Sequence, residues 1–238
     1  MKIEILYPEL SNIFGDFSNV KLLKETLKDA EFIYTNNFDK PHFLDNKVDL
    51  VYIGSMPESK QELAIKRLMP YKEQIRAAIE NDVVMLATGN ALEIFVNHVM
   101  DGENKIEALG LFDELYAVRD FVNRHNSHFV GDFEDIKIVG YKSQFTMCYG
   151  ENKHPFINVV GGCGLNLESK QEGIRYHNFF ATYLLGPFLV LNPYFTKYLL
   201  RTMGYDDAIA FENQAIDAYN HRLDELIKKG RFLMGEHG

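Results

Sequence analysis

The sequence has few cysteines and no long apolar run. Only Cys148 and Cys163 occur in 238 residues, so we expect neither a disulfide framework nor a zinc site built from cysteines. No stretch approaches the roughly 18 apolar residues that a membrane-spanning helix needs. The first residues also lack the apolar core and cleavage site of a signal peptide. These absences predict a soluble protein of the reducing cytoplasm.

Positive charge is also scarce, because 25 Lys and Arg residues stand against 34 Asp and Glu residues, a formal net charge of −9. Affinity for phosphates depends on Lys and Arg, so we expect neither broad nucleic-acid binding nor attraction to an anionic membrane. Hydrophobic residues make up 46% of the chain and charged residues 25%, as in folded globular proteins. At this length, we expect one domain over residues 1–238.

Hydrophobic patterning predicts an α/β fold, because the first half alternates short apolar runs with helical periodicity. The strands predicted there are residues 2–7, 31–34, 49–53 and 83–87, and the helices are residues 20–29, 59–80 and 91–99. The second half predicts strands at 136–141, 145–149 and 157–160, and helices at 193–203 and 206–229. Asp206 is the expected N-cap of the last helix, and Gly230 is its expected stop. We therefore expect a three-layer, open, mostly parallel sheet with helices on both faces.

The predicted strand at 83–87 runs into a sharp turn made of Thr88, Gly89 and Asn90. Such turns at the carboxyl edge of a parallel sheet hold nucleophiles and ligands, because a helix N-terminus offers unpaired N–H groups. A hydrolase would need Ser, Cys or Thr there beside a base. No base can be identified for Thr88, so we expect its hydroxyl to cap the next helix and Gly89 to take the strained backbone.

Two segments carry a resemblance to a known family. One is residues 6–19 (LYPELSNIFGDFSN), and the other is residues 172–178 (EGIRYHN), continued by TYLLGP at 182–187 and NP at 192–193. Their order and spacing resemble class I glutamine amidotransferases of the cobyric acid synthase type, especially the glutaminase subunits of lipid II isoglutaminyl synthases. The resemblance covers nearly the whole chain and implies the flavodoxin-like α/β fold of those amidotransferases.

The resemblance also implies that the catalytic residues of the family are replaced. Aligned without a gap, the nucleophilic cysteine falls at Gly89, and a one-residue shift places it at Thr88, so neither register supplies a thiol. The catalytic histidine falls at Leu185, and Glu93 replaces a glutamine that follows the cysteine by four residues. A nucleophile and its base act as a unit, so their loss predicts almost no glutaminase activity. We assign no catalytic residue and expect no cofactor.

The loop after the strand at 49–53 differs from the family as well. The family has glycines there, whose backbone N–H groups help to stabilise the oxyanion, whereas this chain has Gly54, Ser55, Met56 and Pro57. Pro57 lacks an N–H group, and side chains at Ser55 and Met56 crowd the backbone. Three parts of one mechanism are therefore altered together.

Several polar side chains near the turn are candidates for ligand binding. They are Glu93, Asn90, Glu58, Gln61 and Asp16. Four of them also have a plainer interpretation: Glu93 as an exposed, solvated helix carboxylate, and Glu58, Gln61 and Asp16 as loop caps rather than the mouth of a pocket.

Other reactive residues give weaker signals. Cys163 lies in a glycine-rich run and could be a relocated thiol, but a lone intracellular cysteine is usually inert. His125 and His128 could ligate a metal if they were helical, yet no carboxylate or cysteine completes the set, so we expect a polar loop and no metal. His177 is expected to be structural or exposed.

Three functions follow from these observations. The first, implied by the resemblance, is an inactive amidotransferase-like subunit that positions or regulates a Mur-ligase-like synthetase. The second is a sensor that binds a small amide or amino acid in the degenerate glutaminase pocket. The third is an enzyme of different chemistry in the same crevice, using Thr88, Glu93 or Glu58.

Overall fold

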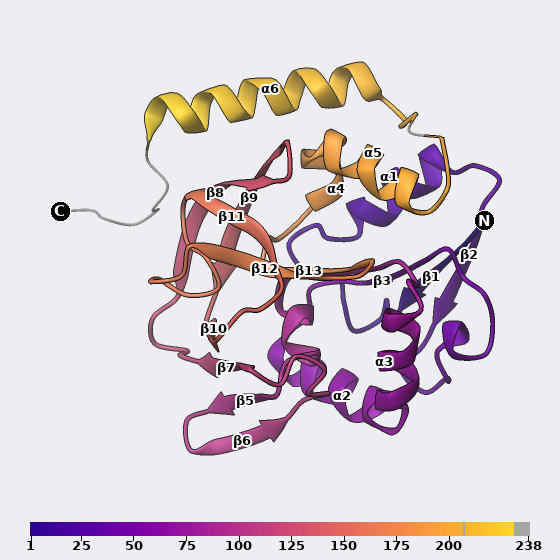
Figure 1. Ribbon diagram of the computed structural model, residues 1–238, viewed down its shortest axis with the longest axis vertical. Helices are drawn as coiled ribbons and strands as arrows, with labels where there is room; N and C mark the ends of the chain where they lie inside the picture. Colours follow the sequence, from indigo (N-terminus) through magenta and orange to yellow (C-terminus); the bar gives the residue numbers. More distant parts are fainter. Residues whose placement is uncertain (207, 231–238) are drawn as a thin grey trace.

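The computed structural model describes residues 1–206 and 208–230. Its centre is a nine-stranded sheet in the order β2-β1-β3-β4-β13-β12-β11-β8-β9 (Figure 1). The strands, in that order, are Glu31–Thr35, Lys2–Leu6, Leu50–Ile53, Met85–Thr88, Phe179–Thr182, Gln171–Tyr176, Pro155–Gly161, His125–Phe133 and Ile136–Gln144. The α/β fold class is confirmed, and the strands of the first half lie within a few residues of their predicted ranges.

The sheet has a parallel and an antiparallel half. Pairing is parallel from β2 through β1, β3 and β4 to β13, and antiparallel from β13 to β9. The strands β3 and β4 are buried along their whole length, which explains their continuous apolar runs. Because β4 lies inside the parallel half, the turn that follows it opens at the carboxyl edge of that half.

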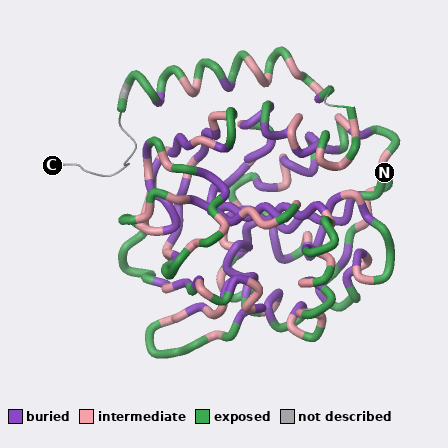
Figure 2. Tube along the Cα trace, viewed as in Figure 1, coloured by how far each residue is buried: buried purple, intermediate pink, exposed green. Residues whose placement is uncertain are grey.

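Helices cover both faces of the nine-stranded sheet (Figure 1). One face carries α1, Ser18–Thr26; α4, Phe188–Leu191; and α5, Pro193–Thr202, while the other carries α2, Glu58–Leu68, and α3, Lys72–Glu80. Each face has its own apolar cluster, one around Val20 and Phe195 and the other around Ile65 and Ile79. Figure 2 shows the buried residues concentrated along the sheet between these layers. The three-layer arrangement is therefore confirmed.

A second, four-stranded sheet lies beside this body in the order β10-β7-β5-β6. Its strands are Thr146–Gly150, Leu115–Arg119, His98–Asp101 and Asn104–Glu107. Three short 3-10 helices complete the elements: η1, His42–Leu44; η2, Met69–Tyr71; and η3, Gly89–Ile94. The last helix, α6, Glu212–Lys229, lies outermost over β8 and β9.

Two predicted helices are wrong in the first half. The helix expected over 59–80 is divided by η2, since Pro70 cannot donate the backbone hydrogen bond of a continuous α-helix. The helix expected over 91–99 is absent, because η3 ends at Ile94 and strand β5 begins at His98.

Two predictions in the second half also need correction. Asp206 does not cap the last helix, which begins at Glu212 after Phe211, a residue with left-handed backbone at φ 58°. Its stop at Gly230, φ 59°, is confirmed. His125 and His128 lie in strand β8 and not in a loop, and their odd spacing directs them to opposite faces.

Candidate functional site

The turn after β4 has the backbone of a strand-to-helix elbow. Strand β4 ends at Thr88, and Gly89 opens η3 with φ +60°, in the left-handed region that favours glycine. The prediction that Gly89 takes the strained backbone of this turn is confirmed. Neighbouring strands β3 and β13 end at the same edge, so their following residues converge on Gly89.

Thr88 does not cap the following helix, which corrects our prediction. Its hydroxyl is buried and donates to Asp16 Oδ1 at 2.9 Å, beneath the turn. The Tyr52 hydroxyl donates to Asp16 Oδ2 at 2.6 Å, and the Ser55 N–H donates to the same oxygen at 3.1 Å. Burial raises the pKa of Asp16 to about 6, although these hydrogen bonds oppose the rise. The Asp16 carboxylate thus holds the turn in place through these hydrogen bonds and does not line the mouth of a pocket.

No space is left for a side chain at Gly89. A Cβ atom there would lie 2.5 Å from Ser55 Oγ, 2.7 Å from Ser55 Cβ and 2.9 Å from Leu185 Cδ2. Distances below 3.0 Å require a shift of the surrounding atoms. Leu185, itself buried, therefore packs against the turn and closes it from one side while Ser55 closes it from the other.

Three backbone N–H groups around the turn already have acceptors. Ser55 donates to Asp16, as described, and Met56 donates to Asn90 Oδ1 at 3.0 Å, while Asn90 Nδ2 returns a bond to the Met56 carbonyl at 2.7 Å. The Gly89 N–H donates to the Leu184 carbonyl at 3.3 Å. Pro57 has no N–H group. A developing oxyanion beside Gly89 would meet no free donor among these residues.

A cavity of about 210 Å³ opens next to Leu185. It is bounded by six segments: the β3–α2 loop, η3, the chain before β8, the end of β9 with the start of β10, the chain after β13, and the loop at 13–14. Of the predicted ligand-binding residues, Glu58, Asn90 and Glu93 line it. The other lining residues are Ile13, Phe14, Ser55, Met56, Pro57, Arg124, Ser143, Gln144, Phe145, Thr146, Tyr183 and Leu185.

Glu93 is fully buried, so its interpretation as an exposed helix carboxylate is wrong. The tight 3-10 turn directs it inward, where Gln61 Nε2 donates to Glu93 Oε2 at 2.9 Å. Gln61 is itself held by Arg119, whose Nη2 donates to Gln61 Oε1 at 2.7 Å. Burial raises the pKa of Glu93 to about 7, and the Gln61 hydrogen bond and the positive charge of Arg119 oppose the rise.

Four buried polar atoms of the cavity lining have no hydrogen-bond partner in the described part of the chain. They are Glu93 Oε1, Ser55 Oγ, Gln144 Oε1 and Tyr183 Oη. Buried polar atoms are normally paired, and an orphan of this kind in a cavity marks a place for a ligand or ordered water. Sequence reasoning missed Gln144 and Tyr183, because only the folded chain brings their distant segments to the turn.

The remaining candidates lie apart from this cavity. Cys163 is buried, and burial raises the pKa of its thiol, as in an inert cysteine. His177 is exposed and pairs with Asp82 at 3.0 Å, in agreement with our expectation. Within residues 1–206 and 208–230, no three His, Cys, Asp or Glu side chains gather into a metal-binding group. No helix of these residues is long and apolar enough to cross a membrane.

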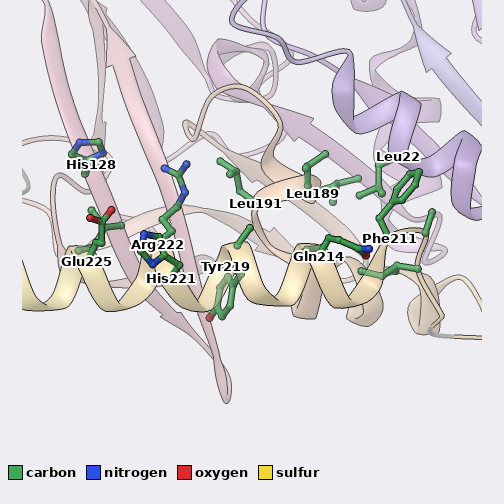
Figure 3. A pocket seen from close by; sticks show the side chains of 16 residues that line it. Leu22, His128, Leu189, Leu191, Phe211, Gln214, Tyr219, His221, Arg222 and Glu225 are labelled. Atoms are coloured by element: carbon green, nitrogen blue, oxygen red, sulfur yellow. The ribbon is translucent and has the colours of Figure 1, made fainter.

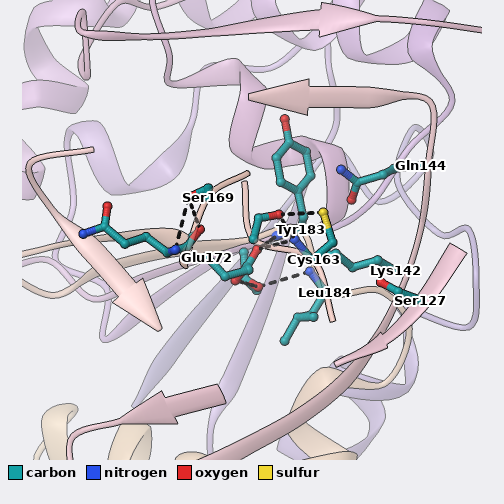
Figure 4. A network of polar contacts seen from close by, with 12 residues as sticks. Ser127, Lys142, Gln144, Cys163, Ser169, Glu172, Tyr183 and Leu184 are labelled. Atoms are coloured by element: carbon teal, nitrogen blue, oxygen red, sulfur yellow. Dashed lines mark hydrogen bonds and ion pairs between the residues drawn. The ribbon is translucent and has the colours of Figure 1, made fainter. Parts of the chain in front are cut away.

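A second buried glutamate, Glu172, holds the chain segment beside the cavity in place (Figure 4). Glu172 Oε1 accepts from the Tyr183 backbone N–H at 2.8 Å and lies 3.4 Å from Lys142 Nζ, and Oε2 accepts from the Thr182 hydroxyl at 2.8 Å. Lys142 also donates to the Gly164 carbonyl at 2.7 Å and is fully buried. This cluster fixes the chain that carries Tyr183 and Leu185.

A larger cavity, about 740 Å³, lies under α6. Figure 3 shows Leu189 and Leu191 across from the helix. Its lining is mostly apolar and shares no residue with the cavity at Gly89. It is a separate feature of the α6 packing.

Comparisons with known proteins agree with the geometry of the fold. The family model of the CobB/CobQ-like glutamine amidotransferase domain matches residues 2–193. Two relatives, each named "Lipid II isoglutaminyl synthase (glutamine-hydrolyzing) subunit GatD", are 28% identical to this chain. The Streptococcus pneumoniae relative aligns over 202 residues, 81% of this chain and 76% of its own. The Staphylococcus aureus relative aligns over 215 residues, 87% of this chain and 85% of its own.

A solved glutamine amidotransferase has the same fold, with a TM-score of 0.54 over 85% of this chain and 98% of that chain at 16% identity. Since the family model covers most of the 238 residues, the chain belongs to the CobB/CobQ-like glutamine amidotransferase domain family.

Proposed function

We propose that this protein is a non-hydrolytic glutamine amidotransferase-like subunit. The observation that carries the proposal is the filled turn: Gly89 has no side chain, and Ser55 and Leu185 occupy the space that one would need. Gly89, not Thr88, has the left-handed backbone of an elbow, which supports Gly89 as the position of the family's cysteine. Leu185 offers no proton acceptor. The backbone N–H groups of Ser55 and Met56 already donate to Asp16 and Asn90, which gives independent support for the absence of hydrolysis.

Ammonia release from glutamine tests this proposal. We expect none above background from the unmodified chain, because nucleophile and base are both missing. In the double variant Gly89→Cys, Leu185→His, the new side chain at position 89 would still clash with Ser55. We therefore expect activity to be recovered only when Ser55→Gly is added as a third change. Release by the unmodified chain at an ordinary enzymatic rate, about 1 s⁻¹ or faster, would contradict the proposal.

The names of the two relatives indicate a class of partner protein. Both are named as subunits of lipid II isoglutaminyl synthase, so we propose that this chain binds a Mur-ligase-like synthetase and positions or regulates it. Co-expression with such a synthetase from the same genome, followed by gel filtration, should give a complex that elutes ahead of either chain. Two separate peaks at micromolar concentrations would count against the partnership.

The cavity favours a second candidate function, binding of a small amide or amino acid as a sensor. Its four unpartnered atoms make a polar interior for which the described chain supplies no hydrogen bonds. A ligand that binds only the folded state raises the melting temperature. Screening amino acids and small amides should therefore find a stabilising compound, and a flat response across the panel would remove this function.

A further inference from the structure

Two of the four unpartnered atoms in the Gly89 cavity, Gln144 Oε1 and Oε1 of the ionised Glu93, can only accept hydrogen bonds, whereas the Ser55 and Tyr183 hydroxyls can also donate. Gln144 Nε2 donates to the Thr146 carbonyl at 2.6 Å, so the Gln144 amide presents its oxygen, which can only accept. Glu93 likewise has its Oε2 bonded to Gln61 and its Oε1 free. No lining residue in the described chain has a buried side-chain nitrogen without a partner. A ligand that pairs with Glu93 and Gln144 must therefore bring hydrogen-bond donors.

Among residues 1–206 and 208–230, no cation directly pairs with the Glu93 carboxylate. The nearest guanidinium, Arg119, directs Nη1 to Glu62 at 2.8 Å and to Asp101 at 3.2 Å, and its Nη2 to Gln61. The Arg119 guanidinium is thus shared between the carboxylates of Glu62 and Asp101. It is connected to Glu93 by hydrogen bonds only through the neutral Gln61 amide. A buried carboxylate without a directly paired cation favours an incoming positive charge.

We propose that this cavity binds an amino acid whose side chain ends in an ammonium group, with that ammonium held by Glu93 and Gln144. The inference rests on the proposed ligand-binding function and names its ligand class. The volume, about 210 Å³, is below the roughly 300–1,000 Å³ of pockets for drug-sized ligands, so a short chain fits best. Met56 and Leu185 supply apolar walls for its methylene groups.

The opening of the cavity can hold the other end of such a molecule. Arg124 is exposed, lines the cavity, and lies over the rings of Phe14 at 5.9 Å and Phe145 at 5.3 Å. Its guanidinium matches an α-carboxylate. Glu58, half-buried at the start of α2, lines the same cavity and matches an α-ammonium group.

Ammonium binding requires the ionised form of Glu93, so affinity should depend on pH. Burial holds the pKa of Glu93 near 7. The titratable groups that act on it are Arg119 from β7, Glu58 from α2, Tyr183 after β13 and Cys148 from β10. Of these, Arg119 and the Tyr183 hydroxyl favour the ionised form, and Glu58 opposes it. Affinity should increase roughly tenfold between pH 6 and pH 8, as the ionised fraction rises from about one tenth to about nine tenths.

Ornithine, glutamine and norvaline form a matched set for the test. Ornithine and glutamine place nitrogen at the same position along the side chain, as an ammonium and as an amide, and norvaline has no side-chain nitrogen. With the full chain at pH 8, ornithine at roughly five times its Kd should raise the melting temperature by about 2–4 °C. Norvaline should have no effect, and calorimetry at pH 6 should show the loss of ornithine affinity.

The outcomes separate this inference from the function on which it rests. Binding of glutamine without ornithine would overturn the ammonium class and leave ligand binding intact. A flat response to ornithine, glutamine and the wider panel would overturn both. Ornithine binding that does not change between pH 6 and pH 8 would remove Glu93 from the site.

A variant pair makes the assignment specific. Glu93→Gln keeps the shape and removes the charge, so it should weaken ornithine at least tenfold and abolish the pH dependence. Glu103→Gln makes the same change at an exposed position in the β5–β6 turn and should bind ornithine like the unmodified chain. Equal loss in both variants would contradict the role of Glu93, and the pH series on the unmodified chain needs neither variant to fold.

Discussion

Glu93 and Glu172 are both completely buried, and both lie beside Tyr183, but their carboxylates have different surroundings. Each oxygen of Glu172 accepts a hydrogen bond, and a buried lysine lies 3.4 Å away. Glu93 has one bonded oxygen and one that faces a cavity. Full pairing identifies Glu172 as part of the scaffold, whereas the free oxygen of Glu93 identifies a place for something outside the chain.

The largest effect should come from Glu172→Gln. The change keeps the shape but leaves the buried Lys142 ammonium without its counter-charge, which costs about 3–5 kcal/mol of the free energy of unfolding. Urea denaturation at pH 8 measures it. A loss below about 1 kcal/mol would mean that Glu172 does not hold Lys142 in the folded chain.

Thr182→Val tests the same carboxylate through a neutral neighbour. Valine keeps the volume of threonine but removes the donor to Glu172 Oε2 and the acceptor of the Leu184 N–H. Loss of a hydrogen bond to a buried charge lowers the free energy of unfolding by about 2–3 kcal/mol. Serine at this position keeps the hydroxyl, so Thr182→Ser should retain more stability than Thr182→Val.

Glu93→Gln should have the opposite sign to Glu172→Gln. The folded pKa of Glu93, about 7, exceeds the usual 4.5, so the folded state binds the extra proton and loses stability as pH rises between these values. Glutamine does not ionise, and we expect a gain on the order of 2 kcal/mol at pH 8 and almost none at pH 4. Denaturation curves at both pH values measure the difference. A lower free energy of unfolding for Glu93→Gln at pH 8 would contradict the difference that we infer between Glu93 and Glu172.

Tyr183→Phe should have the smallest effect on stability. The backbone N–H that binds Glu172 remains, and the hydroxyl that is removed makes no close hydrogen bond within the described residues, although it acts on the nearby Glu93 carboxylate. The free energy of unfolding should change by less than about 0.5 kcal/mol. Thermal denaturation checks this value, and a loss above about 1.5 kcal/mol would show that the hydroxyl is paired.

Four strands of the parallel half, β1 to β4, could be predicted because they are short, largely apolar runs at regular spacing, whereas β13 was not predicted. Strands β3 and β4 and the turn at Gly89 follow from local sequence alone. The helix predicted after this turn failed because apolar residues at 91–96 fit a buried 3-10 turn as well as an α-helix. Strand β5 and its small sheet then went unrecognised.

The site was predicted in part. Gly89, Leu185 and Ser55 could be singled out through the family resemblance, and the structure places them in contact. The burial of Glu93 could not be predicted, because it depends on the direction in which η3 turns. Gln144, at the end of β9, and Tyr183, just after β13, reach the cavity from segments that are far from Gly89 in the sequence. Tyr183 belongs to the TYLLGP segment of the family resemblance, but nothing in the sequence marks it or Gln144 as lining a cavity.

The packing of Ser55 and Leu185 over Gly89 also constrains the order in which the sequence can change. Any side chain introduced at Gly89 first meets atoms from two segments that are distant along the chain. A change at Gly89 alone is therefore unfavourable, while a smaller residue at Ser55 or a reshaped one at Leu185 is tolerated beforehand. If substitutions accumulate one at a time, the neighbours must change before the turn itself, so we expect changes at the three positions to be coupled.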